Sequence, residues 1–207
     1  MIAGPDWSAG EAYLRQNVPE LRALVERFGS CSLRPRPSDQ YFKILITGIV
    51  AQQLPPEASL ALTGKLETVL GGCISPEAIL KADQEQLVTT GLSPQKITYA
   101  KEFAKAAASG DIDFASLAEL PDKQVRKTLL PVRGLGQWTI EMFMLLSLCR
   151  QDVLPADDFL LKKGIQKLFN LPQVPKRGTI MTLTKKWSPW RGLAAWYLWQ
   201  QTDTKER

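Results

Sequence analysis

The chain has 207 residues, of which 44% are hydrophobic and 23% charged, and its formal net charge is +5. These values are ordinary for a globular protein with a sizeable core, and the moderate basic excess is weak support for a nucleic-acid partner. Three widely spaced cysteines and the absence of histidine exclude a zinc site, a four-cysteine iron–sulfur cluster and histidine-dependent nucleophilic catalysis.

The spacing of apolar residues, prolines and glycines predicts an all-α protein of roughly ten to twelve helices, and thirteen segments have a helical pattern. In the first part of the chain we expect helices over residues 8–15, 19–28, 41–53, 58–70, 76–82, 83–89 and 94–108. In the second part we expect them over residues 114–120, 122–129, 138–148, 158–169, 179–185 and 191–200. No segment has the alternating pattern of a strand, and the apolar runs are too short to cross a bilayer.

The segment LPVRGLG, residues 130–136, is the most informative part of the sequence. Gly134 and Gly136 directly precede an apolar helix, so the turn leaves backbone N–H groups unpaired at a helix N-terminus. Such groups and the helix dipole favour an anion, and Arg133 adds a positive charge. A plain corner between two helices explains the glycines equally well. The basic net charge favours a cradle for a DNA phosphate.

Two adjacent carboxylates, Asp157 and Asp158, follow the glycines by about twenty residues. Either one could simply cap the helix that begins there. The two need not share a task, however, and Asp157 could cap the helix while Asp158 supplies a fixed negative charge.

Aromatic residues and one glutamine pair complete the candidate features. Six tryptophans are present, of which four lie within residues 187–199 and Trp138 follows the glycine turn. Core packing is expected for most of them, although one or two could wall a pocket for a flat, electron-poor ring. The helix end at Gln52, Gln53 and Leu54 could be a wedge that fills the space left by an extruded base. The same three residues occur in many helices without any such role.

Five segments together resemble, in the same order, one known superfamily. They are GIVAQQL, GLSPQKITYAKEFA, LPVRGLGQWTIEMFML, LPADD and KWSPWRGLAAWYLW. This pattern resembles the helix–hairpin–helix, Gly/Pro-rich, aspartate-containing (HhH-GPD) superfamily of DNA glycosylases, and within it the 3-methyladenine DNA glycosylase II (AlkA/Mag) branch. The resemblance covers residues 39–199. It implies helices in two lobes with the active-site cleft between them, in one glycosylase unit over residues 1–207. The hairpin would occupy residues 129–139, and the N-terminal β domain of some bacterial members would be absent.

The resemblance implies a monofunctional DNA N-glycosylase of base excision repair. Such an enzyme flips alkylated purines, such as 3-methyladenine and 7-methylguanine, out of the duplex and hydrolyses the N-glycosidic bond to leave an abasic site. By position, Asp158 matches the catalytic aspartate, and Trp138, Met142 and Trp199 match residues of the base pocket. Bifunctional relatives have an imine-forming lysine where this chain has Trp138. Met142 departs from the bacterial pattern, which has an aromatic residue there.

The resemblance also implies how DNA would be held. The residues expected to contact it are Arg133, Gly134, Gly136, Thr139, Gln52, Gln53 and Leu54, and the wedge is Gln53, Leu54 or Val50. No cofactor is required, but the main-chain carbonyls of Leu130, Val132 and Leu135 would bind Na⁺ or K⁺.

The expected partner is double-stranded DNA with alkylated bases, and no association with a membrane is expected. The chain is expected to be an intracellular monomer, located in the cytoplasm or nucleoid of a prokaryote or in the nucleus of a eukaryote. The alternative is a non-catalytic helix–hairpin–helix DNA-binding module. Such a module would need the hairpin, but neither the aspartate nor the aromatic residues.

Overall fold

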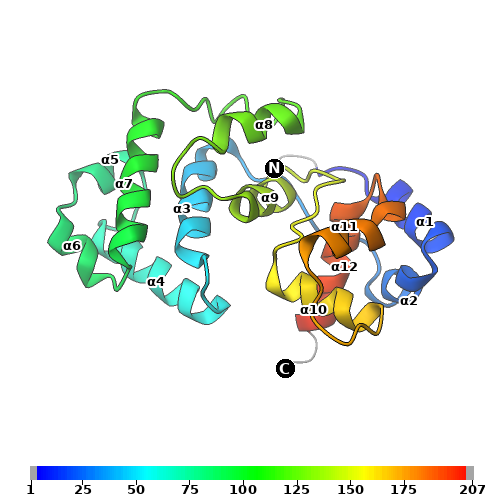
Figure 1. The fold of residues 1–207 in the computed structure, drawn as a ribbon. Coiled ribbons are helices and arrows are strands. Elements are labelled where there is room, and N and C mark those ends of the chain that lie inside the picture. The colour runs from blue at the N-terminus through cyan, green and yellow to red at the C-terminus, as the bar shows by residue number, and fades with distance from the viewer. Residues whose placement is uncertain (1–3, 204–207) are drawn as a thin grey trace. The chain divides into compact units, whose positions relative to one another are not determined.

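A computed structural model describes residues 4–203 of the chain, and within them every regular element is a helix (Figure 1). This confirms the all-α class predicted from the sequence. The chain divides into two compact units. The first combines the N-terminal segment up to Pro35 with the C-terminal part from Met144, and the second is Arg36–Phe143. None of the helices in the described residues is long and apolar enough to cross a membrane.

The first unit is built around its C-terminal helix. It contains α1 (Ser8–Asn17), α2 (Pro19–Phe28), α10 (Phe159–Leu168), α11 (Arg177–Leu183), the 3₁₀ helix η2 (Lys185–Trp187) and α12 (Arg191–Asp203). Helices α1, α2 and α10 pack against α12 (Figure 1). Six consecutive α12 residues, 193–198, are buried, as expected for a helix that is apolar on all sides. Trp187 and Trp196 are core residues, which agrees with the packing role expected for most tryptophans.

The second unit is organised around α7. It contains the 3₁₀ helix η1 (Ser38–Gln40), α3 (Tyr41–Ala51), α4 (Pro56–Val69), α5 (Pro76–Lys81), α6 (Gln84–Thr89), α7 (Pro94–Ala108), α8 (Asp122–Leu129) and most of α9 (Gln137–Leu146). Helix α7 packs against α3, α5 and α6 (Figure 1). In the core, the rings of Phe42 and Phe103 stack with centroids 4.9 Å apart, and Phe114 meets both edge-on.

The helix predicted over residues 114–120 is wrong, because this segment forms a series of turns. The Asp113 side chain accepts hydrogen bonds from the backbone N–H groups of Ala115 and Ser116 and so competes with helix formation. Pro121 then ends the segment. Phe114 and Leu117 still enter the core, so their apolar character was a correct indication of burial but not of helix.

Three further helices end two residues earlier than the sequence predicts, and one of them is α11, which ends at Leu183. Helix α3 stops at Ala51, because Gln53 adopts a positive φ of 59°. Helix α9 stops at Leu146, and Cys149 has a φ of 53°. At the ends of α3 and α9 a tight turn replaces the last helical residues expected.

Candidate functional site

The glycine hairpin connects α8 to α9, and its two glycines differ in what they require. The turn is closed by backbone hydrogen bonds from Val132 N to Leu129 O and from Leu135 N to Val132 O. Gly134 has a φ of 94°, and a Cβ there would lie 2.5 Å from the Cβ of Tyr99. Both the backbone conformation and the lack of space therefore require glycine at this position. A Cβ on Gly136 would meet no atom within 4 Å. The space beside Gly136 is therefore open to an approaching group.

Arg133, at the tip of the hairpin, rests on α7. Its guanidinium lies 5.6 Å from the centre of the Tyr99 ring and is 3.1 Å from Glu102 Oε1. The Arg133 side chain is still 66% exposed. The charge expected to contact DNA is thus present at the surface, and it is partly neutralised by Glu102.

Gln52 and Thr139, which the resemblance assigned to DNA, bond to one another. Thr139 is 2% exposed, and its hydroxyl accepts a hydrogen bond of 3.0 Å from Gln52 Nε2. The same nitrogen donates to the carbonyl of Gly134 at 2.8 Å. Gln53 is exposed and Leu54 is half-buried. Of these four side chains, Gln53 is the one presented most fully to solvent.

Trp138 and Met142 lie one turn apart on α9 and therefore share a face of this helix. Both are half-buried, whereas their neighbours Thr139, Ile140, Glu141 and Phe143 are buried. The second unit thus presents a partly exposed pair of polarisable, apolar side chains directly after the hairpin. Such a surface suits a flat ring.

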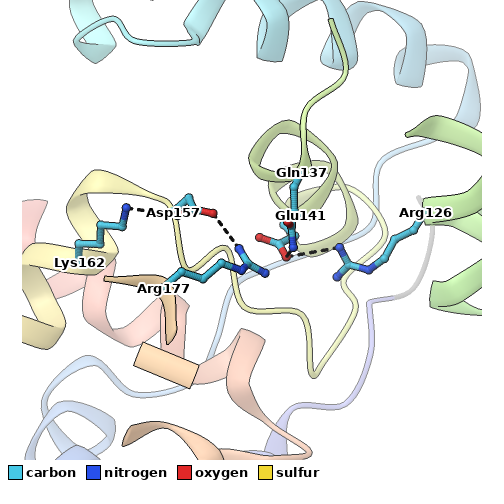
Figure 2. Close-up of polar contacts among 6 residues, drawn as sticks. All are labelled: Arg126, Gln137, Glu141, Asp157, Lys162 and Arg177. Carbon is cyan, nitrogen blue, oxygen red and sulfur yellow. Dashed lines mark hydrogen bonds and ion pairs between the residues drawn. The ribbon is translucent and has the colours of Figure 1, made fainter. Parts of the chain in front are cut away.

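Behind this face, Glu141 joins the two hairpin helices. This carboxylate is buried on α9, where it accepts hydrogen bonds from Arg126 Nη1 of α8 at 3.4 Å and from Gln137 Nε2 at 3.1 Å (Figure 2). A buried charge requires such partners, because burial of an unpaired carboxylate is strongly unfavourable. No motif in the sequence indicates these three residues, since a Glu three residues after a Trp carries no recognisable signal.

In the first unit, Asp158 is the N-cap of α10, with Oδ1 accepting a 2.8 Å hydrogen bond from Leu161 N. The indole Nε1 of Trp199 donates to the same oxygen at 2.9 Å. Asp158 therefore caps the helix as one interpretation proposed, and its carboxylate is also held by a side chain from α12. The sequence indicated Trp199 as a wall of the base pocket but gave no sign of this hydrogen bond.

Asp157 has a different environment from its neighbour. It is exposed and forms ion pairs with Arg177 at 2.9 Å and with Lys162 at 3.3 Å (Figure 2). Partial burial raises the pKa of the Asp157 carboxyl, but hydrogen bonds from Arg177 and Lys162 outweigh this effect and hold the pKa below its ordinary value. Of the two alternatives for the cap, the one with Asp157 is wrong, because Asp158 makes the capping bond.

The segment that leads to Asp158 is fixed at its start by Asp152. This carboxylate receives two hydrogen bonds from the guanidinium of Arg191, at 2.8 and 2.6 Å, and one of 2.9 Å from Ser188 Oγ. Arg191 is the first residue of α12. The paired hydrogen bonds of an arginine and a carboxylate define both distance and orientation. Asp152 therefore ties the segment that precedes Asp158 to the first residue of α12, the helix that contains Trp199.

The three hairpin carbonyls proposed as cation ligands differ in their backbone hydrogen bonds. The Val132 carbonyl accepts from Leu135 N, whereas the carbonyls of Leu130 and Leu135 receive none of the backbone bonds that close the turn in the described chain. A carbonyl has two lone pairs, so all three remain suitable for a monovalent cation. Within residues 4–203, no group of three or more Cys, Asp or Glu side chains is placed to bind a metal.

Comparison with known proteins identifies the family of this chain. A sequence profile described as the HhH-GPD superfamily base excision DNA repair protein matches residues 46–189. The chain is 31% identical over 204 residues to the alkylbase DNA glycosidase-like protein mag2 of Schizosaccharomyces pombe, covering 97% of this chain and 96% of that protein. It is 34% identical over 162 residues to DNA-3-methyladenine glycosylase 1 of the same organism, covering 77% of this chain and 71% of that protein.

Solved structures of similar fold include two proteins of the same kind. The S. pombe 3-methyladenine DNA glycosylase Mag1, in complex with abasic DNA, superposes with a TM-score of 0.86 at 30% identity, over 95% of this chain and 97% of that one. A DNA-3-methyladenine glycosidase from Bacillus halodurans superposes with a TM-score of 0.79 at 31% identity, over 98% and 93%. The chain belongs to the HhH-GPD superfamily of base excision DNA repair proteins.

Proposed function

We propose that this protein is a monofunctional DNA glycosylase that removes alkylated purines from duplex DNA. The observation that carries the proposal is the fixed carboxylate of Asp158, held by the α10 N-terminus and by the Trp199 indole. Capping of α10 requires only the hydrogen bond from Leu161 N, whereas the second hydrogen bond, from Trp199, fixes the carboxylate beyond what a cap needs. The names of the relatives support the substrate class, since they include DNA-3-methyladenine glycosylase 1 and a 3-methyladenine glycosylase bound to abasic DNA.

The chemistry needs one fixed negative charge. The C1′–N bond of the damaged nucleotide breaks, the base departs with the bonding electron pair, and positive charge develops on the deoxyribose. A preorganised carboxylate stabilises this oxocarbenium-like state, because it needs no reorganisation when the charge appears. A water molecule then bonds to C1′ and loses a proton to Asp158 or to solvent. A cationic alkylated purine leaves as a neutral base, so no general acid is needed.

The face formed by Trp138 and Met142 supports recognition of such a base. The electron-rich face of an indole attracts a cationic ring, and a thioether packs well against aromatic surfaces. Trp138 also occupies the position at which bifunctional relatives have a lysine. A tryptophan cannot form an imine with C1′, so the abasic product is expected to remain uncleaved.

The hairpin is proposed as the main contact with the DNA backbone. Its open space at Gly136 and the exposed guanidinium of Arg133 suit a phosphate. The carbonyls of Leu130, Val132 and Leu135 are proposed to hold Na⁺ or K⁺ beside that phosphate. DNA affinity should then be higher in NaCl or KCl than in a choline salt of equal ionic strength. Equal affinities in the three salts would remove the cation from the proposal.

The direct test is the release of bases from methylated duplex DNA, with the products separated by chromatography. We expect free 3-methyladenine and 7-methylguanine, with strands that break only after alkali treatment. Strand cleavage without alkali, or trapping by borohydride, would instead indicate a bifunctional enzyme. Binding of the DNA without release of any base would favour the non-catalytic module.

A further inference from the structure

The turn after α3 has an unusual conformation. Gln53 has a φ of 59°, in the left-handed region that residues with a side chain rarely adopt, and its side chain is exposed. Such a conformation persists only where the surrounding structure holds it, and it occurs preferentially at functional sites. The contacts around residues 52–54 show what holds this turn.

The first support comes from the hairpin. Gln52 Nε2 donates to Gly134 O at 2.8 Å and to Thr139 Oγ1 at 3.0 Å, so one amide joins the end of α3 to both the turn of the hairpin and the start of α9. Directly before the turn, a Cβ on Gly48 would lie 2.6 Å from Thr139 Cγ2, which shows how closely α3 and α9 approach. The position of the turn is therefore fixed relative to the hairpin.

The second support is Lys96, in the first turn of α7. Its ammonium donates to Val50 O at 2.7 Å and to Gln52 O at 2.8 Å, and so occupies two carbonyls at the C-terminal end of α3. A cation is favoured at this end of a helix. Lys96 is half-buried, and burial lowers the pKa of its ammonium. A lysine held in this way is engaged with the protein and is not a surface charge that attracts DNA.

We propose that Gln52 and Lys96 are positioning residues that hold the turn at residues 52–54, so that the Gln53 side chain fills the gap left by a flipped base. The inference rests on the proposed glycosylase function. It assigns Gln53, rather than Leu54 or Val50, as the wedge, because Leu54 is half-buried and Val50 is buried. Neither Gln52 nor Lys96 contacts the base in this account, and both act through Gln53.

The test compares a lesion that must be unpaired with one that is already unpaired. The first duplex has a single 7-methylguanine opposite cytosine, and the second has the same nucleotide in a bulge with no opposing base. Lys96→Met keeps the aliphatic stem and removes the donors, and Gln52→Met does the same for the amide. Lys105→Met is the matched control, since Lys105 is an exposed lysine on the same helix. Thermal unfolding confirms that each variant is folded.

We expect Lys96→Met and Gln52→Met to slow single-turnover release from the paired duplex by about tenfold and release from the bulge by less than about twofold, because an unpaired base needs less help to leave the stack. Lys96→Arg should recover much of the rate, and Lys105→Met should behave as wild type on both substrates. Gln53→Ala should show the same selective loss. The double variant with Lys96→Met should be no slower than Gln53→Ala alone, since both changes remove one function.

The possible failures are distinguishable. If wild type releases 7-methylguanine from the bulge and Lys96→Met slows both substrates equally, the positioning role is wrong while the proposed function stands. Multiplicative losses in the double variant would also show that Lys96 does not act through Gln53. If wild type releases no base from either substrate, the proposed function itself has failed.

Discussion

The two hairpin glycines give a sharp test of the account, because alanine should harm each position for a different reason. At Gly134 the damage should be to folding. A side chain at this positive φ costs roughly 1–2 kcal/mol, and the crowding against Tyr99 adds about 1–3 kcal/mol. For a chain of this length the sum of about 2–5 kcal/mol corresponds to a fall in Tm of roughly 4–20 °C. This loss is a large fraction of ordinary protein stability.

At Gly136 the damage should be to DNA binding alone. An added Cβ meets nothing in the free protein, so the free energy of unfolding should change by less than about 0.5 kcal/mol. If the backbone there donates to a phosphate, the methyl group obstructs a charge-assisted hydrogen bond, and the Kd for abasic-site duplex should rise about tenfold or more. Calorimetry measures the free energy of unfolding, and fluorescence anisotropy measures the Kd for the abasic-site duplex. Wild-type affinity in Gly136→Ala would refute the proposed phosphate contact, and wild-type stability in Gly134→Ala would refute the packing on Tyr99.

Three other changes have defined outcomes. Trp199→Phe removes one donor to the Asp158 carboxylate, so single-turnover base release should slow by up to about 100-fold while DNA affinity is kept. An unchanged rate would show that the indole N–H is dispensable. Glu102→Gln frees Arg133 and should tighten DNA binding by up to about fivefold at low salt, with no gain at high salt; weaker binding would contradict this. Partial burial raises the pKa of the Asp152 carboxyl, but its hydrogen bonds to an arginine and a serine outweigh this effect and hold the pKa below its ordinary value of about 3.9. The stabilisation that Asp152 gives the folded state is therefore complete above that ordinary value and is lost as the pH falls through the lowered pKa. Asp152→Asn should therefore flatten the acid end of the stability profile measured by chemical denaturation.

The local features of the fold were predictable from the sequence because their causes are local. Ser75 and Ser93 each precede a proline, and both cap a helix as such pairs indicate. The prediction failed at residues 114–120, where Asp113 satisfies the backbone in a different way. That failure is also local, but an aspartate before an apolar segment is as often a helix cap as the start of a turn.

The candidate site was predictable only in part. The hairpin and Asp158 lie in contiguous motifs, which is why the sequence indicated them. Trp199 is 41 residues from Asp158, and Lys96 is 44 residues from Gln52, so no spacing rule indicates either hydrogen bond. A lysine in an amphipathic helix resembles a solvated surface charge until its ammonium is seen to bond with two carbonyls of another helix.

The most direct test of the central claim is single-turnover base release by wild type and Asp158→Asn on one defined duplex, with binding to abasic-site DNA measured in parallel. Asparagine is as good an N-cap as aspartate, so this change removes the charge and keeps α10 capped. We expect that wild type releases the base, that Asp158→Asn is slower by at least about 100-fold, and that both bind the abasic duplex equally. Equal rates in the two proteins would contradict the role of Asp158, and release by neither, with binding intact, would identify a non-catalytic DNA-binding protein.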